Sequence, residues 1–192
     1  MMEFRKEGKG SKMKKMVLVT LLLIAAMFPS MTFAKDKDEK KVLLPKNSEG
    51  LVQYQEAMEI PGASAAILFS RAKNFGAMTF RSAINTLQNE DQAAGRLVYK
   101  GTFSAADIMG IFRDIRFTMT IEVKDGKARI TLSNMSSLYV EVNQFSQSVE
   151  SLLKEDGTAR TGAGKLVASI DKEAREIIEE FKRAMVKQEE NW

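Results

Sequence analysis

The stretch FTMTIEVKDGKARITL, residues 117–132, decides how this chain folds. At its centre lies Asp125-Gly126, a dipeptide that tolerates the two positive φ angles of a type I′ turn. Apolar and polar residues alternate on both sides of this dipeptide, which is the period of a half-buried strand. The stretch therefore predicts a two-stranded antiparallel hairpin.

The turn also fixes the register of the two predicted strands. If Lys124 lies opposite Lys127, the apolar residues of both strands share one face. The apolar pairs are Val123–Ala128, Ile121–Ile130 and Met119–Leu132, and the polar pairs are Glu122–Arg129, Thr120–Thr131 and Thr118–Ser133. A slip of one residue would turn the apolar side chains outward, so this register is strongly specified.

The residues before the hairpin predict a strand, a helix and two more strands. Apolar residues alternate from Val52 to Ile60, and Pro61-Gly62 then opens a helix through about Met78. Short strands follow at about 83–88 and 96–102, with the polar residues 89–92 as the turn between them.

The residues after Asn134 predict weaker elements and then a long helix. We expect a short apolar alternation within 136–147, a helical turn at 149–153 and a loop at 155–164. Apolar residues at three- and four-residue spacing predict a helix over 164–188, with the i,i+4 ion pairs Asp171–Arg175, Lys172–Glu176 and Glu179–Arg183. The predicted fold class is α+β, an antiparallel sheet with a helix after its first strand and the long C-terminal helix packed on one face.

The N-terminal residues are typical of a secretory signal peptide. Lys14-Lys15 precedes an apolar run of thirteen residues, Met16–Phe28, and Thr32-Phe33-Ala34 follows as a cleavage site. A membrane-spanning helix needs about 20 apolar residues, so cleavage after Ala34 fits better than an uncleaved anchor. We expect residues 1–34, with Met13 as the start, to be removed, and the mature chain, without a transmembrane segment, to work in the periplasm or envelope.

The rest of the chain divides into a tether and one domain. Residues 35–41 alternate charges without an apolar residue, and residues 45–50 are rich in turn formers. We therefore expect 35–50 to be a flexible, charged tether and 51–192 to be a single α+β domain. Residues 1–34 hold six of the 29 Lys and Arg and two of the 25 Asp and Glu, which leaves 23 of each. The pI of about 9.2 thus comes largely from the leader and indicates no nucleic-acid partner.

The middle of the chain resembles a known family. The residues that carry the likeness are FSRAKNF (69–75), QNED (88–91) with Gly95 and Leu97, and FTMTIEVKDGKARI (117–130). Residues 60–134 resemble a family of exported bacterial domains of unknown function, DUF4468, with a TATA-binding-protein-like fold. The resemblance implies a curved antiparallel sheet and a source among Gram-negative gut anaerobes. It implies no activity, because the family has no established catalytic or binding residues. Phe75 and Ala128 depart from the usual Trp and aromatic residue, which weakens any aromatic recognition surface there.

Composition and spacing exclude several chemistries. The chain has no His and no Cys, so Ser-His-Asp and Cys-His catalysis and the usual zinc sites are absent. Residues 157–165 resemble a phosphate-binding loop but lack its Gly at Ala159 and its Ser or Thr at Leu166. We interpret Glu90 and Asp91 as a solvated turn, and we predict no catalytic, cofactor-binding or metal-binding residue and no cofactor.

The polar hairpin face is the remaining candidate site. Its basic residues Arg113, Arg116, Lys124, Lys127 and Arg129 are interpreted as a solvated sheet face. The predicted interaction surface comprises Arg116, Thr118, Thr120, Glu122, Arg129 and Thr131. The leading hypothesis is an exported, non-enzymatic module that binds an envelope protein or ligand through this surface or through 136–164. The alternatives are an exported carboxylate-dependent hydrolase, whose two acids would converge within about 5–9.5 Å, and an assembly subunit.

Overall fold

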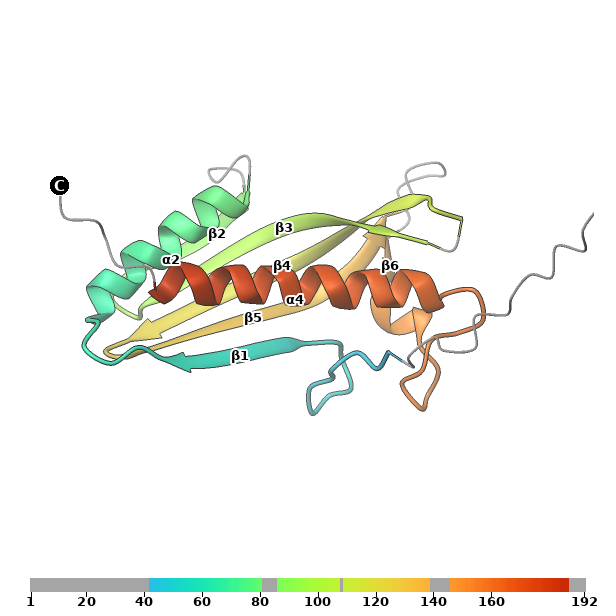
Figure 1. Cartoon of the computed structure of the whole chain (residues 1–192), viewed down its shortest axis with the longest axis horizontal. Coiled ribbons are helices and arrows are strands. Elements are labelled where there is room, and N and C mark those ends of the chain that lie inside the picture. The colour runs from blue at the N-terminus through green and yellow to red at the C-terminus, as the bar shows by residue number, and fades with distance from the viewer. Residues whose placement is uncertain (1–41, 81–85, 108, 139–145, 187–192) are drawn as a thin grey trace, which may run out of the picture. The chain divides into compact units, whose positions relative to one another are not determined.

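The centre of the fold is the hairpin that Asp125-Gly126 closes (Figure 1). In the computed structural model, which describes residues 42–80, 86–107, 109–138 and 146–186, strands β4 (Phe112–Lys124) and β5 (Lys127–Leu138) are antiparallel. Every predicted cross-strand pair from Thr118–Ser133 to Lys124–Lys127 is present, which confirms the register. Gly126 has φ +69°, but the φ of Asp125 is negative, so the two-residue loop is in the predicted place without being the predicted type I′ turn.

A β-bulge at Asn134 keeps both halves of β5 facing the core. Thr118 pairs with Ser133, but Arg116 pairs with Ser136, so β5 has one more residue than β4 between these pairs. Asn134 takes the extra position with φ +53°, a conformation that Asn adopts more readily than most residues. As a result Leu132 and Met135, three residues apart, are both buried.

Three further strands complete the path of the sheet. They are β1 (Tyr54–Glu59), β2 (Leu87–Asp91) and β3 (Arg96–Ala106), and the order is β1-β5-β4-β3-β2. The short β6 (Ser146–Ser148) pairs with the end of β5, and all these pairings are antiparallel. The antiparallel α+β class is thereby confirmed.

The strand expected at 83–88 differs from the structure. β2 begins at Leu87 and continues through Asp91, so Asn89, Glu90 and Asp91 form a strand rather than a turn. The turn starts later because the Asp91 carboxylate accepts a hydrogen bond from Ala94 N at 2.9 Å. Residues 81–85 lie outside the described residues.

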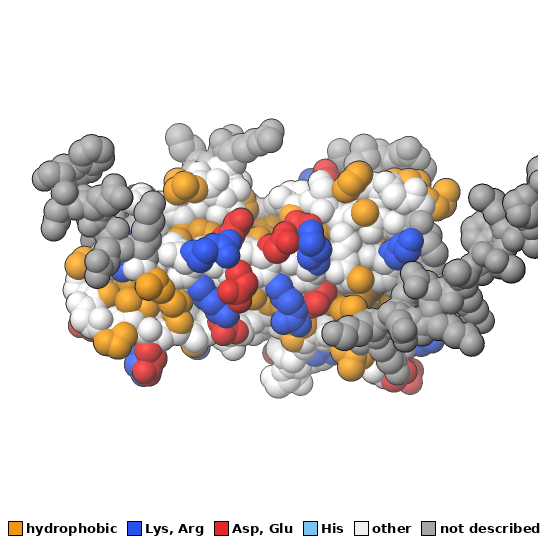
Figure 2. Space-filling view, in the orientation of Figure 1, with side chains coloured by type: hydrophobic (Ala, Val, Ile, Leu, Met, Phe, Trp, Pro, Cys, Tyr) orange, Lys and Arg blue, Asp and Glu red, His pale blue; other side chains and the backbone are white. Residues whose placement is uncertain are grey.

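Two helices cover one face of the sheet (Figure 1). Helix α2 spans Ala65–Thr79 and α4 spans Gly164–Val186, while Val149–Leu152 form the short 3₁₀ turn η1 in the predicted place. The rings of Phe75 and Phe181 meet edge-on at a centroid distance of 5.6 Å, which joins the helices. Figure 2 shows this helical side of the molecule, where acidic and basic side chains intermingle along its middle.

Helix α2 begins later than the Pro61-Gly62 signal suggested. Ser64 is its N-cap and accepts from Ile67 N, and the Asp125 carboxylate accepts from Ala65 N at 2.7 Å. The hairpin turn therefore helps to satisfy the free N–H groups of the helix. Arg71 is half-buried and donates to the carbonyl of Met185 at 2.7 Å.

The long helix is tied to the edge strand β1 by a buried tyrosine. Tyr54 Oη donates to Asp171 Oδ1 at 2.9 Å, and Asp171 also pairs with Arg175 at 3.0 Å. Burial and the Asp171 carboxylate raise the pKa of Tyr54 well above its ordinary value. The predicted pairs Asp171–Arg175 and Lys172–Glu176 are present, whereas Glu179 contacts Lys182.

The described part of the expected tether is packed. Leu44 is buried, Lys46 pairs with Val52, and Asn47 closes a turn through Glu49 N and Leu51 N. Leu44 thus joins the core, while most residues from 45 to 50 are exposed, and the flexibility of the tether stays a prediction. Residues 1–41, including the expected leader, lie outside the described residues.

Candidate functional site

The sheet has a second face, opposite α2 and α4, which we call the open face. Core residues such as Ile115, Met119 and Ile121 alternate along β4 with exposed or half-buried residues that point the other way. All six residues of the predicted interaction surface lie on the open face. The four on β4 alternate with buried residues, and the two on β5, Arg129 and Thr131, lie opposite Glu122 and Thr120 of β4.

The register arranges the open face in cross-strand rows. One row alternates in charge from β2 to β5: Asp91, Arg96, Glu122 and Arg129. The next row is largely uncharged: Asn89, Val98, Thr120, Thr131 and Gln55. Sequence reasoning missed Arg96 and Gln55, because the turn dictates the register of the hairpin but not which strands flank it.

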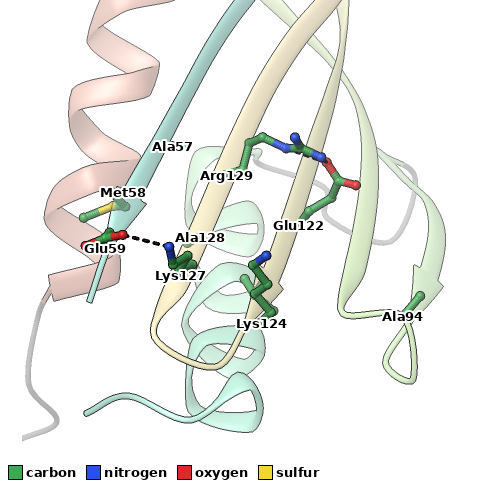
Figure 3. Close-up of a pocket in the computed structure, with 10 residues that line it drawn as sticks. Ala57, Met58, Glu59, Ala94, Glu122, Lys124, Lys127, Ala128 and Arg129 are labelled. Atoms are coloured by element: carbon green, nitrogen blue, oxygen red, sulfur yellow. Dashed lines mark hydrogen bonds and ion pairs between the residues drawn. The ribbon is translucent and has the colours of Figure 1, made fainter. Parts of the chain in front are cut away.

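A shallow hollow of about 550 Å³ lies where the open face meets the β4–β5 turn (Figure 3). The small residues Ala57 and Ala94 line it, and charged side chains surround it. Figure 3 shows Glu122 and Arg129 reaching toward one another from neighbouring strands. Of the six predicted residues, the hollow brings together these two, while Arg116, Thr118, Thr120 and Thr131 do not line it.

Most of the charged side chains that line the hollow form two ion pairs. Arg129 donates from Nε and Nη2 to Glu122 Oε2, at 2.9 and 2.6 Å, and Lys127 Nζ lies 2.8 Å from Glu59 Oε1. Lys127 lowers the pKa of Glu59 below its ordinary value. Among the described residues Lys124 has no acidic partner. The hollow therefore offers one uncompensated cation between two solvent-exposed ion pairs.

The remaining acidic and basic candidates are dispersed. Glu90 lies on the helical side, where it pairs with Lys73 at 2.8 Å, so it does not join Glu122. Arg113, expected on or beside the polar hairpin face, pairs with Asp107 at 3.1 Å and lies on the core side of β4, the side of Ile115. Within the described segments, no group of three or more His, Cys, Asp or Glu could hold a metal ion.

The segment that resembled a phosphate loop is a compact turn. Thr158 is buried, its hydroxyl donates to Asp156 Oδ1 at 2.6 Å, and its carbonyl accepts from Lys154 N. Helix α4 begins at Gly164, after this turn.

None of the helices in the described part of the chain is long and apolar enough to cross a membrane.

The chain is similar in sequence to one protein family and in fold to solved structures. Residues 54–137 match the family described as domain of unknown function (DUF4468) with TBP-like fold. The chain is similar to a TBP-like protein from Parabacteroides distasonis, with 16% identity, 76% of this chain and 98% of that chain covered, and a TM-score of 0.65. It is also similar to a DUF4468 family protein from Bacteroides ovatus, with 18% identity, coverage of 81% and 99%, and a TM-score of 0.63. No curated protein matches. At these identities the solved structures show the fold alone.

Proposed function

We propose that this chain, whose residues 54–137 are a domain of the DUF4468 family with TBP-like fold, is a non-enzymatic module that binds a protein partner or envelope ligand through its open face. The observation that carries this proposal is the asymmetry of the sheet. Two helices bury one face, while rows of Thr, Arg, Lys and Glu cross the other without any covering element among the described residues.

The chemistry of the open face supports binding rather than catalysis. Glu59 and Glu122 both line the hollow, but each is paired with a cation, and the pKa of Glu59 is lowered. A glycoside hydrolase needs one carboxyl group that keeps its proton near neutral pH. Two paired carboxylates are poorly suited to that role, so the hydrolase alternative is not favoured by the site.

The proposal includes export to the periplasm or envelope, which rests on the leader-like residues 14–34. Fractionation of expressing cells, followed by intact mass measurement, tests this part. We expect a chain that begins at Lys35 outside the cytoplasm. A full-length chain in the cytosol would contradict export, while leaving binding by the open face open to test.

A charge-reversal pair tests the open face without removing its ion pair. Glu122→Arg with Arg129→Glu keeps the attraction between the two side chains but inverts the charge pattern of the row. Lys172→Glu with Glu176→Lys does the same on the outer surface of α4 and serves as the matched control. Tagged chains are used to capture partners from the envelope fraction of the native cells.

We expect the open-face reversal to lose a specific partner that the wild type and the α4 reversal retain. Equal retention by all three chains would contradict the proposed binding face. If the wild type hydrolyses glycan substrates and Glu122→Gln does not, the hydrolase alternative would replace the binding proposal.

A further inference from the structure

The turn between β3 and β4 exposes three large apolar side chains. Met109 is 78% exposed, Ile111 53% and Phe112 73%, although the residues on either side belong to a well-packed sheet. We call Met109, Ile111 and Phe112 the apolar tip. We propose that the apolar tip inserts into the surface of a lipid bilayer, an inference that does not rest on the proposed function of the open face.

The tip is held in a fixed conformation by one buried carboxylate. Asp107 Oδ1 accepts from Met109 N at 2.9 Å and from Ile111 N at 3.1 Å, and Asp107 Oδ2 pairs with Arg113 at 3.1 Å. The Asp107 side chain is only 8% exposed. The exposed side chains of Met109 and Ile111 are therefore carried by backbone that hydrogen bonds fix to Asp107.

Several backbone groups of the turn are already paired internally, which favours insertion into lipid. Besides the two bonds to Asp107 Oδ1, Gly110 N donates to Asp107 O at 3.0 Å and Asp107 N donates to Ile111 O at 2.9 Å. Hydrocarbon offers no hydrogen-bonding partners, so an unpaired N–H would oppose insertion. In this turn the described N–H groups from 107 to 111 all have partners, and Arg113 compensates the one carboxylate.

Behind the tip the open face carries two cations and one acid, Asp114, which accepts a hydrogen bond from Ser104 Oγ at 3.1 Å. Arg116 lies on β4 four residues after Phe112, about 13 Å along the strand, and Lys100 lies on the neighbouring strand opposite Thr118. Both are exposed, and in the described ranges neither has an acidic partner. With the tip about 5–10 Å into the interface, Arg116 would lie near the level of the lipid phosphates, and Lys100 would lie about 7 Å farther out.

The position of the apolar residues favours a bilayer over a protein groove. They lie in and just after the turn between β3 and β4, at the end of the sheet opposite the β4–β5 turn (Figure 1), rather than along one strand. A lipid surface can enclose such a projecting turn from all sides, whereas a flat protein surface would cover one side only. The experiment below also distinguishes a bilayer from a protein partner.

A single tryptophan placed at the tip tests insertion directly. The chain is used as purified from expressing cells, with Trp192→Phe so that the introduced residue is the sole reporter. Phe112→Trp reports on the tip, and Ile67→Trp, at a position on α2 that is 44% exposed, is the control. The vesicles contain phosphatidylethanolamine and phosphatidylglycerol, with and without brominated acyl chains.

We expect the emission of the Phe112→Trp chain to shift to the blue and to be quenched by the brominated lipid, and the Ile67→Trp chain to show neither effect. Met109→Ser with Phe112→Ser should weaken vesicle binding at least about tenfold, whereas Met78→Ser, at a position 87% exposed on α2, should not. Unshifted, unquenched emission from a Phe112→Trp chain with wild-type circular dichroism would overturn the proposal. Shielding of this reporter only by added envelope proteins would also overturn it and would assign the tip to a protein contact.

Discussion

Gly76 lies where α2 passes closest to the sheet, and the ring of Tyr99 fills the space that a side chain would need. A Cβ built on Gly76 would lie 2.6 Å from Tyr99 Oη, and Tyr99 is itself buried against the ring of Phe80. Burial also raises the pKa of Tyr99 to about 12, with Glu90 adding to the effect. The phenol thus stays neutral and fixed between the helix and the sheet.

We expect Gly76→Ala to destabilise the domain by about 1–3 kcal/mol, because overpacking of a rigid core outweighs the better helix propensity of Ala. Urea unfolding followed by circular dichroism measures this difference. Ala77→Gly, at an exposed position of the same helix, is the control and should cost about 0.5–1 kcal/mol. A more stable Gly76→Ala variant would show that Tyr99 can move aside.

Asn134 gives a second prediction at this scale. Because its φ of +53° suits Gly and Asn but not β-branched residues, Asn134→Gly should leave stability nearly unchanged, whereas Asn134→Val should cost about 1–3 kcal/mol. Thermal unfolding of the two variants beside the wild type checks this. Equal effects of Gly and Val would indicate that the bulge can shift to a neighbouring residue.

The sheet face on which a residue lies was predictable where apolar and polar residues alternate along a strand. The six residues of the predicted interaction surface all lie on the open face because a strand exposes every second side chain. Arg113 was misplaced because its partner Asp107 lies beyond a turn whose geometry no local pattern indicated. The role of the six residues in binding stays a prediction.

The turn between β3 and β4 is an element whose stability should depend on pH. Burial alone would raise the pKa of Asp107, but hydrogen bonds from Met109 N and Ile111 N, together with Arg113, lower it below its ordinary value. A carboxyl group with a lowered pKa in the fold stabilises the fold at neutral pH. That contribution declines as the pH falls below about 4 and through the lowered pKa.

We therefore expect Asp107→Asn to lower the urea midpoint at pH 7 and to approach the wild type at about pH 3. Glu180→Gln, on the exposed side of α4, is the control and should differ little from the wild type at both values. A gap between Asp107→Asn and the wild type that stays constant or widens in acid would contradict this account.

Elements were predictable where one local signal dominates. The Asp125-Gly126 turn defined the central hairpin, and the apolar spacing of 164–188 defined α4. The extent of β2 and the start of α2 were not predictable, because contacts from other elements decide them. Asp91 delays the β2–β3 turn, and Asp125, sixty residues away, caps α2.

For the whole molecule, α4 is the element that closes the core. Phe181 is fully buried and meets Phe75 of α2, while Ile170 and Met185 are buried along the same helix. We expect Phe181→Ala to cost about 3–5 kcal/mol, through lost burial and a residual cavity. Calorimetry should show one cooperative transition at a lower midpoint. Arg183→Ala, at an exposed position of the same helix, should leave the midpoint nearly unchanged.

The arrangement of the whole sheet was predictable only in class. Alternation and element order indicate an antiparallel α+β fold, and the family resemblance agrees with the TBP-like fold that the comparisons found. No local pattern states that β1 pairs with β5, because the cause is the packing of distant segments. For the same reason the rows of the open face, which cross four and five strands, could not be predicted beyond the two strands of the hairpin.

That pairing of β1 with β5 sets the order in which the chain can fold. β3, β4 and β5 are successive neighbours and need only short loops to meet, whereas Tyr54 must wait for Leu132, which the ribosome makes much later. Contacts of such large sequence separation form late and slowly. We therefore expect β1 to join the sheet only after β5 has been made, with its backbone available until then to chaperones or to neighbouring chains.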